Sequence, residues 1–145
     1  MKGTLTTETS IKIEATPAQV WKALTTPELI QKYLFGTHVS SDWKEGSTIT
    51  YSGEYDGKKY QDKGIIKKLV PEKMLQSTYW SSAGGKKDKP ENYNLVTYQL
   101  TESGHETRVT LSQENISTEK EKKHVTENWN MVLKKLKEVV ENEKE

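Results

Sequence analysis

The sequence contains no cysteine, and no stretch of it is apolar for long enough to span a bilayer. Without cysteine, disulfides, thiolate nucleophiles and cysteine-ligated metal sites are excluded. The first eight residues also lack the apolar core of a signal peptide, so we predict a cytoplasmic protein with no membrane span. Neither a glycine-rich phosphate motif nor the Gly-x-Ser-x-Gly pattern is present. A phosphate-binding loop and a serine-nucleophile site therefore both lack support.

An excess of one charge sign is also missing, since 22 Lys and Arg face 21 Asp and Glu. Domains that bind nucleic acid more often carry a basic excess, so we predict no nucleic-acid partner. Residues 58–91 are locally basic, with nine Lys against four acidic residues. We interpret these lysines as solvated strand faces and a loop, with an anionic partner as the less favoured alternative.

The apolar share is modest at 32%, but the chain has four Trp and seven Tyr. Disordered chains rarely contain so many aromatic residues, so a folded domain is predicted. A chain of 145 residues fits one domain and can bury roughly two thirds of its unfolded surface. We therefore predict a single domain over residues 1–145, as a monomer or weak dimer.

The N-terminal region predicts one strand and two short helices. Residues 4–15 alternate weakly between apolar and polar, as in a half-buried strand. Thr16-Pro17 and Thr26-Pro27 each place proline at the first helical position, and Gln19 can complete a capping box with Thr16. The apolar residues of the two helices are Val20, Trp21 and Leu24, then Leu29, Ile30, Tyr33 and Leu34, with Gly36 as a stop signal.

From residue 47 to residue 113 the apolar period is two, which predicts a series of strands. Ile49 and Tyr51 mark the first, residues 58–70 the second and residues 74–82 the third. Later strands include residues 96–100 and 109–111. The turn signals are Asp56-Gly57 and residues 102–105, and residues 83–91, including Gly84-Gly85, are expected to form an exposed loop. Short connections between consecutive strands predict an antiparallel sheet.

The C-terminal region predicts one long amphipathic helix. Thr118 and Glu121 can form a capping box at its start. Its apolar residues recur at spacings of three and four: Val125, Trp129, Val132, Leu133, Leu136 and Val140. The predicted fold is therefore α+β, with a curved antiparallel sheet of six or seven strands wrapped around this helix.

Several segments, in order, resemble one known family: Ile13–Leu29, Tyr33–Thr37, Ser41–Gly46, Asp62–Gly64 with Leu69–Pro71 and Leu75, and Trp129–Lys137. From about residue 8 to residue 141 the chain is similar to the homologues of the activator of the ninety-kilodalton heat-shock chaperone ATPase. That family belongs to the START and polyketide-cyclase superfamily (SRPBCC), whose fold is called helix-grip. The resemblance implies a cavity between sheet and long helix that holds lipids, polyketides or other hydrophobic molecules. It also implies that some members are enzymes and that the eukaryotic activators are co-chaperones.

Aromatic residues are the candidates for lining such a cavity, because ligand pockets are mostly apolar with a few polar groups. The alternative is that the same residues only fill the core. Since Tyr79 and Trp80 are adjacent in a strand, one must point away, and the family's strand pattern favours Tyr79 inward. The predicted ligand-binding residues are Tyr33, Phe35, Trp43, Tyr51, Tyr79, Tyr98, Trp129 and Leu133.

Titratable residues give little support for catalysis. His38 and Asp42 can approach the cavity mouth, but a metal site there lacks a third ligand. His105 and His124 are expected in solvent. Glu54 and Asp62 can form a carboxylate pair only if both face inward, and we expect them to be solvated or paired with Lys.

The predicted function is therefore non-enzymatic binding of a small hydrophobic or aromatic molecule, with no cofactor and no metal. One alternative is a co-chaperone-like module that binds a chaperone through its Lys-rich stretch. The second alternative is a cyclase-like or hydrolase-like enzyme.

Overall fold

The computed structural model describes residues 3–55, 57–81 and 87–143. These residues form seven strands, three α-helices and a short 3-10 turn at Pro90–Asn92. The strands are β1 (Leu5–Ile13), β2 (His38–Ser41), β3 (Thr48–Tyr55), β4 (Lys58–Val70), β5 (Met74–Tyr79), β6 (Asn94–Ser103) and β7 (Glu106–Ile116). The helices are α1 (Pro17–Thr25), α2 (Pro27–Tyr33) and α3 (Glu119–Glu143).

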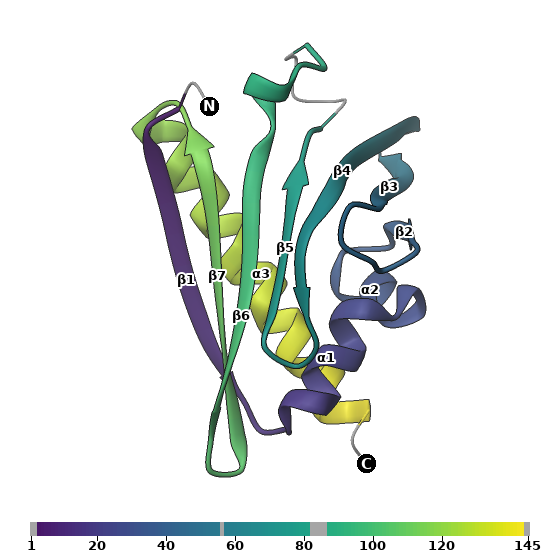
Figure 1. The fold of residues 1–145 in the computed structure, drawn as a ribbon, viewed down its shortest axis with the longest axis vertical. Helices are drawn as coiled ribbons and strands as arrows, with labels where there is room; N and C mark the ends of the chain where they lie inside the picture. The colour runs from purple at the N-terminus through teal and green to yellow at the C-terminus, as the bar shows by residue number, and fades with distance from the viewer. Residues whose placement is uncertain (1–2, 56, 82–86, 144–145) are drawn as a thin grey trace.

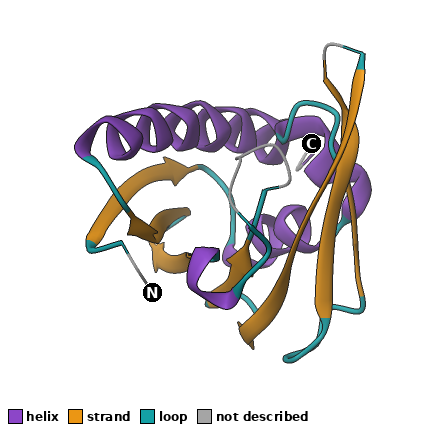
Figure 2. Ribbon diagram, turned by 90° about the horizontal axis from the view of Figure 1, so that it is seen from above, coloured by secondary structure: helices purple, strands orange, loops and turns teal. Residues whose placement is uncertain are grey.

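All seven strands belong to one antiparallel sheet with the order β1-β7-β6-β5-β4-β3-β2. The long helix α3 crosses one face of this sheet diagonally (Figure 1). Viewed from above, the sheet curves alongside α3, while α1 and α2 lie near its C-terminal end (Figure 2). The predicted α+β helix-grip architecture is confirmed, with seven strands.

Local hydrogen bonds explain where the two short helices begin and end. At the start of α1 the Thr16 hydroxyl accepts from the Gln19 amide at 3.2 Å, and the Gln19 side chain accepts from the Thr16 amide at 2.9 Å. This is the predicted capping box. Helix α2 ends at Tyr33, and the Gly36 amide then donates to the Gln31 carbonyl across the last turn. Phe35 and Gly36 both have positive φ there, as in a Schellman motif.

The strands follow the predicted ranges closely, with two differences. Strand β2 was not predicted, because it has only four residues and buries one side chain, Val39, so that it has no apolar period. The third predicted strand extended to residue 82, but β5 ends at Tyr79, and Trp80 forms an isolated bridge with Lys63. In the predicted loop 83–91, residues 83–86, including Gly84-Gly85, lie outside the described residues.

Along α3, the core is concentrated at the C-terminal part of the helix. The buried residues of α3 all lie in its C-terminal part: Val132, Leu133, Leu136, Val139 and Val140. The N-terminal half of α3 is joined to β1 by hydrogen bonds between Thr7 and Thr126 and between Thr9 and Asn130. In that half no residue of α3 is fully buried, and part of its contact with the sheet is made by polar side chains. None of the described helices combines the length and apolarity needed to cross a membrane.

Candidate ligand-binding site

Five aromatic residues from five different elements meet on the inner face of the sheet. We call them the aromatic cluster, and its members are Tyr33 of α2, Tyr51 of β3, Tyr79 of β5, Tyr98 of β6 and Trp129 of α3. The rings of Tyr51 and Tyr79 pack edge to face with centroids 5.5 Å apart, and those of Tyr98 and Trp129 do so at 6.2 Å. Both pairs have the geometry that aromatic side chains prefer.

Buried polar side chains hold three of these rings in place. The Trp129 indole nitrogen donates to the Gln113 side-chain oxygen at 2.7 Å. The Tyr79 hydroxyl donates to the Asp62 carboxylate at 2.6 Å, and Tyr51 is hydrogen-bonded to Ser77. Asp62, Ser77 and Gln113 are all buried. The cluster therefore combines apolar ring surface with fixed polar groups, the combination found in ligand sites.

The tyrosine hydroxyls of the cluster are strongly desolvated. Burial raises the pKa of Tyr51 from 10.0 to about 12, with the hydrogen bond to Ser77 opposing the increase and the Asp62 charge adding to it. Burial also raises the pKa of Tyr33, Tyr79 and Tyr98. For Tyr79, the hydrogen bond to Asp62 and the charge of Asp62 add to this effect. All four hydroxyls are therefore held in the neutral form, able to donate hydrogen bonds.

We expect this cluster to make the fold sensitive to alkali. A tyrosine with a raised pKa in the folded state stabilises the fold fully below pH 10, and this stabilisation is lost as the pH rises through the folded-state value. For Tyr51 that window runs from about 10 to about 12. Absorbance of tyrosinate and circular dichroism, recorded together, should show the cluster ionising only as the protein unfolds. Ionisation of all seven tyrosines near pH 10 with the fold intact would contradict this.

The structure brings six of the eight predicted site residues together at the interior. Besides the cluster, Leu133 of α3 is fully buried. Trp43 packs against the core from the loop after β2, with φ of 55°. Phe35 lies apart, with 64% of its surface exposed. Tyr79 points inward and Trp80 outward, as predicted. The role of the eight residues in binding a ligand stays a prediction.

Three interior polar residues were not among the predicted site residues, and for Asp62 the expectation of solvation was wrong. Asp62 is buried and accepts a hydrogen bond from Tyr79, so it is not solvated. It faces inward because it is two residues from Gly64 and four from the buried Ile66, on the same side of β4. The alternation of β4 in the sequence therefore indicates that Asp62 faces inward. In the same way, Gln113 lies two residues after Leu111 and four after Val109, on the buried side of β7.

The other titratable candidates do not converge. Glu54, His38 and Asp42 are exposed, and so are His105 and His124, as predicted for the last two. Within residues 3–55, 57–81 and 87–143, no group of three His, Asp or Glu side chains is arranged to hold a metal ion. Catalysis through His38 and Asp42 therefore gains no support from their positions.

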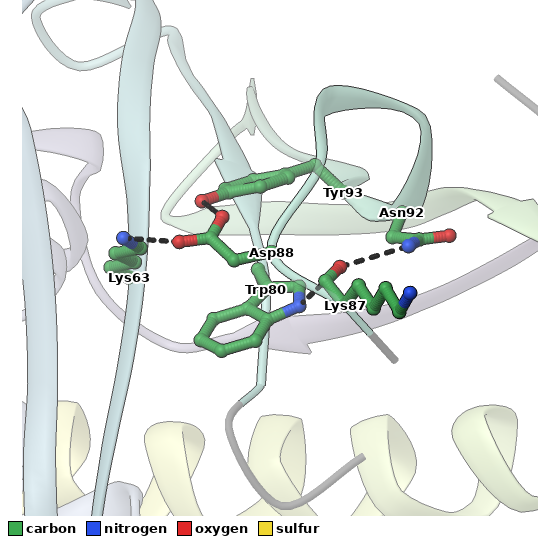
Figure 3. Close-up of polar contacts among 6 residues, drawn as sticks. All are labelled: Lys63, Trp80, Lys87, Asp88, Asn92 and Tyr93. Carbon is green, nitrogen blue, oxygen red and sulfur yellow. Dashed lines mark hydrogen bonds and ion pairs between the residues drawn. The ribbon is translucent and has the colours of Figure 1, made fainter. Parts of the chain in front are cut away.

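A second cluster lies on the opposite face of β4 and β5, and Figure 3 shows its contacts. The Lys63 ammonium forms an ion pair with Asp88 at 2.6 Å, and Asp88 accepts from the Tyr93 hydroxyl at 2.5 Å. Tyr93 stacks on Trp80, whose indole nitrogen donates to the Lys87 carbonyl at 3.2 Å. The bonds to Lys63 and Tyr93 lower the pKa of Asp88. These contacts fasten residues 87–93 to the outer face.

Two surface hollows are lined by residues that the structure describes, and neither includes a member of the aromatic cluster. One, of about 160 Å³, lies where α1 and α2 meet the end of α3 and includes Lys22, Leu29 and Val140. The other, of about 380 Å³, lies beside β2 and is lined mainly by serine and threonine. In contrast, Tyr51, Tyr79, Tyr98 and Trp129 of the cluster are only partly buried, so their packing leaves some ring surface accessible.

Comparison with known proteins identifies a matching family and solved structures with the same fold. Residues 14–141 match the family described as activator of Hsp90 ATPase homolog 1-like protein. The solution structure of a Cytophaga hutchinsonii protein is 45% identical, with a TM-score of 0.85, covering 99% of this chain and 98% of that one. No curated protein sequence matches significantly.

More distant solved structures share the fold. A Chromobacterium violaceum protein is 21% identical, with a TM-score of 0.80 over 94% of this chain and 96% of its own. The Aha1 dimer of Colwellia psychrerythraea is 22% identical, with a TM-score of 0.74 over 94% and 96%. Because the family match spans most of the chain, the protein belongs to the activator of Hsp90 ATPase homolog 1-like family.

Proposed function

We propose that this protein binds a small hydrophobic or aromatic molecule between the sheet and the N-terminal half of α3, without catalysing a reaction. The observation that carries the proposal is the aromatic cluster: four desolvated tyrosine hydroxyls and one tryptophan are gathered on the inner face, and all of these residues except the buried Tyr33 are only partly covered. Such rings offer apolar contact area, and their hydroxyls offer a few directed hydrogen bonds.

The way α3 is packed supports entry of a ligand beside the cluster. The helix buries five residues after Met131, whereas Val125, Thr126 and Trp129 before it are only partly buried. A segment with few buried apolar contacts opens at a lower free energy than the rest of the fold. The N-terminal half of α3 is therefore the part of the grip that can move to admit a molecule, while the C-terminal half stays anchored.

The proposal is tested by titrating isotope-labelled protein with a panel of lipids, flavonoids and polyketide-like ring compounds. Amide signals near Tyr33, Tyr51 and Tyr98 and the Trp129 indole signal should shift for at least one class of compound. Trp129→Phe should weaken that ligand about fivefold, because it removes ring area and the bond to Gln113. Trp80→Phe is the matched control, since Trp80 lies on the outer face, and it should leave the affinity unchanged.

The proposal is abandoned if no interior signal moves at millimolar ligand, or if Trp80→Phe weakens binding as much as Trp129→Phe. Under the proposal the protein acts in the cytoplasm as a monomer or weak dimer whose partner is the small molecule. Binding to a chaperone, and cyclase-like or hydrolase-like activity, stay predictions from the sequence.

A further inference from the structure

Three polar groups on the inner face have no hydrogen-bond partner among the residues that the structure describes. They are the hydroxyls of Tyr33 of α2 and Tyr98 of β6, and the side-chain nitrogen Nε2 of Gln113 of β7. The Trp129 indole nitrogen can only donate, so the Gln113 atom that it meets at 2.7 Å is the oxygen, and Nε2 is left without a partner. Native interiors leave few polar groups unpaired, so these three call for an explanation.

Each of the three groups borders a space that a water-sized molecule can reach. Within the described residues, no fully enclosed side-chain nitrogen or oxygen atom of a buried or half-buried residue lacks a hydrogen-bond partner. Because the three groups have none, they are not fully enclosed, although Tyr33 has only 2% of its surface exposed and Gln113 only 8%. Room for at least a small polar group therefore exists beside each of them.

The three groups lie in one region of the interior. Tyr98 pairs with Leu111, two residues before Gln113, so Tyr98 and Gln113 are diagonal neighbours on the inner side of β6 and β7. The Trp129 ring contacts the Tyr98 ring edge to face and bonds to Gln113, and so it joins the two. Burial raises the pKa of the Tyr33 hydroxyl, and the Tyr98 hydroxyl raises that pKa further. The two hydroxyls are therefore close enough to interact.

Such groups select a ligand by hydrogen bonding. The Nε2 group can only donate, and a neutral tyrosine hydroxyl donates to any oxygen that carries no hydrogen of its own. A carbonyl oxygen has two lone pairs and can accept from two donors at once. A hydrocarbon in the same place would keep the donors from water and leave them unpaired, which weakens binding. Sites built to hydrogen-bond a ligand therefore reject analogues that lack the bonding group.

We infer that Tyr33, Tyr98 and Gln113 are specificity-determining residues that donate hydrogen bonds to a carbonyl oxygen on an otherwise hydrophobic ligand. This inference rests on the proposed function and narrows its ligand class to molecules that carry an accepting oxygen. The two tyrosines contribute through their hydroxyls, so removing one oxygen atom from each is expected to remove most of the selectivity.

Two compounds of the same shape test it: 2-acetylnaphthalene, which has a ketone oxygen, and 2-isopropenylnaphthalene, which has a CH2 group in its place. Dissociation constants are measured at neutral pH by nuclear magnetic resonance titration of the labelled protein. The ketone should bind about tenfold more tightly than the alkene. Tyr98→Phe should reduce this preference to about threefold, and the double variant Tyr33→Phe with Tyr98→Phe to less than about twofold. Affinity for the alkene should stay within about twofold, whereas a general loss of packing would weaken both compounds equally.

Tyr93→Phe is the matched control, because it removes a hydroxyl that donates to Asp88 on the outer face, and it should keep the preference of the wild-type protein (Figure 3). If the alkene binds the wild-type protein as tightly as the ketone, the inference fails while the proposed function stands. An unchanged preference in the folded double variant has the same meaning. If neither compound and no member of the wider panel shifts interior signals, the proposed function itself fails. Should the double variant not fold, Tyr98→Phe and the wild-type protein decide.

Discussion

Replacing Gly64 with alanine is expected to lower the free energy of unfolding by about 3 kcal/mol or more. A Cβ atom built on Gly64 would lie 1.7 Å from the backbone carbonyl oxygen of Thr78 and 2.5 Å from its carbonyl carbon. Both atoms belong to the main chain of the neighbouring strand β5, so no side-chain rotation can relieve the clash. The two strands would have to separate, at a position where Gly64 is buried.

The reason for the close approach lies in the local pairing of β4 and β5. Lys63 pairs with Trp80 and Ile66 with Ser77, and between these pairs the Ile65 amide donates to the Thr78 hydroxyl at 2.9 Å. The register then shifts between Ile66 and Lys68. A glycine at such an irregularity allows the strand to bend and the partner backbone to approach. Asp62 and Lys63, just before this glycine in β4, point to opposite faces because successive side chains of a strand alternate.

Urea unfolding and thermal melting of Gly64→Ala measure the effect, with an expected fall in melting temperature of about 10 °C. Ile65→Ala is the matched control from the next position, where the side chain is 42% exposed, and it should cost less than about 1 kcal/mol. If Gly64→Ala melts within about 2 °C of Ile65→Ala, the contact with Thr78 does not restrict this position.

Much of the fold could be predicted because its signals are local in the sequence. The capping box of Thr16 and Gln19 forms as predicted, and β4 spans residues 58–70 as its alternation indicated. The apolar spacing of α3 likewise marks the residues that are buried in its C-terminal part. Each of these features depends on residues within a few positions of one another, so periodicity and capping rules suffice to identify them.

The features that escaped prediction depend on residues far apart in the sequence. The need for glycine at position 64 arises from Thr78, and the burial of Asp62 is compensated by Tyr79. Strand β2 is held by its pairing with β3, not by an apolar pattern of its own. At the candidate site, the aromatic residue types were visible in the sequence, but the polar partners that hold their rings were not. These pairings join residues that are distant in the sequence, so no local pattern indicates them.

Asn115 is the strongest example of such a long-range dependence. Its side chain is buried at the end of β7, where its amide nitrogen donates to the carbonyls of Glu91 at 3.0 Å and Tyr93 at 2.8 Å. Its side-chain oxygen accepts from the Gly3 amide. Its φ is 67°, in the left-handed region that asparagine tolerates better than most residues. One side chain therefore joins Gly3, the 3-10 turn with the residue that follows it, and the last strand.

We expect Asn115→Ala to lower the free energy of unfolding by about 3 kcal/mol, because it removes three hydrogen bonds in a buried place and puts alanine in the left-handed region. Asn115→Gly loses the same bonds without the backbone penalty, so it should be more stable than Asn115→Ala by about 1 kcal/mol. Asn128→Ala, at an exposed position of α3, is the control and should change stability by less than about 0.5 kcal/mol. Urea unfolding gives all three values, and hydrogen exchange of the Gly3 amide reports the lost bond directly.

Equal stability of Asn115→Ala and the wild-type protein would show that these bonds contribute nothing. Equal stability of the alanine and glycine variants would show that the left-handed backbone is not strained by alanine.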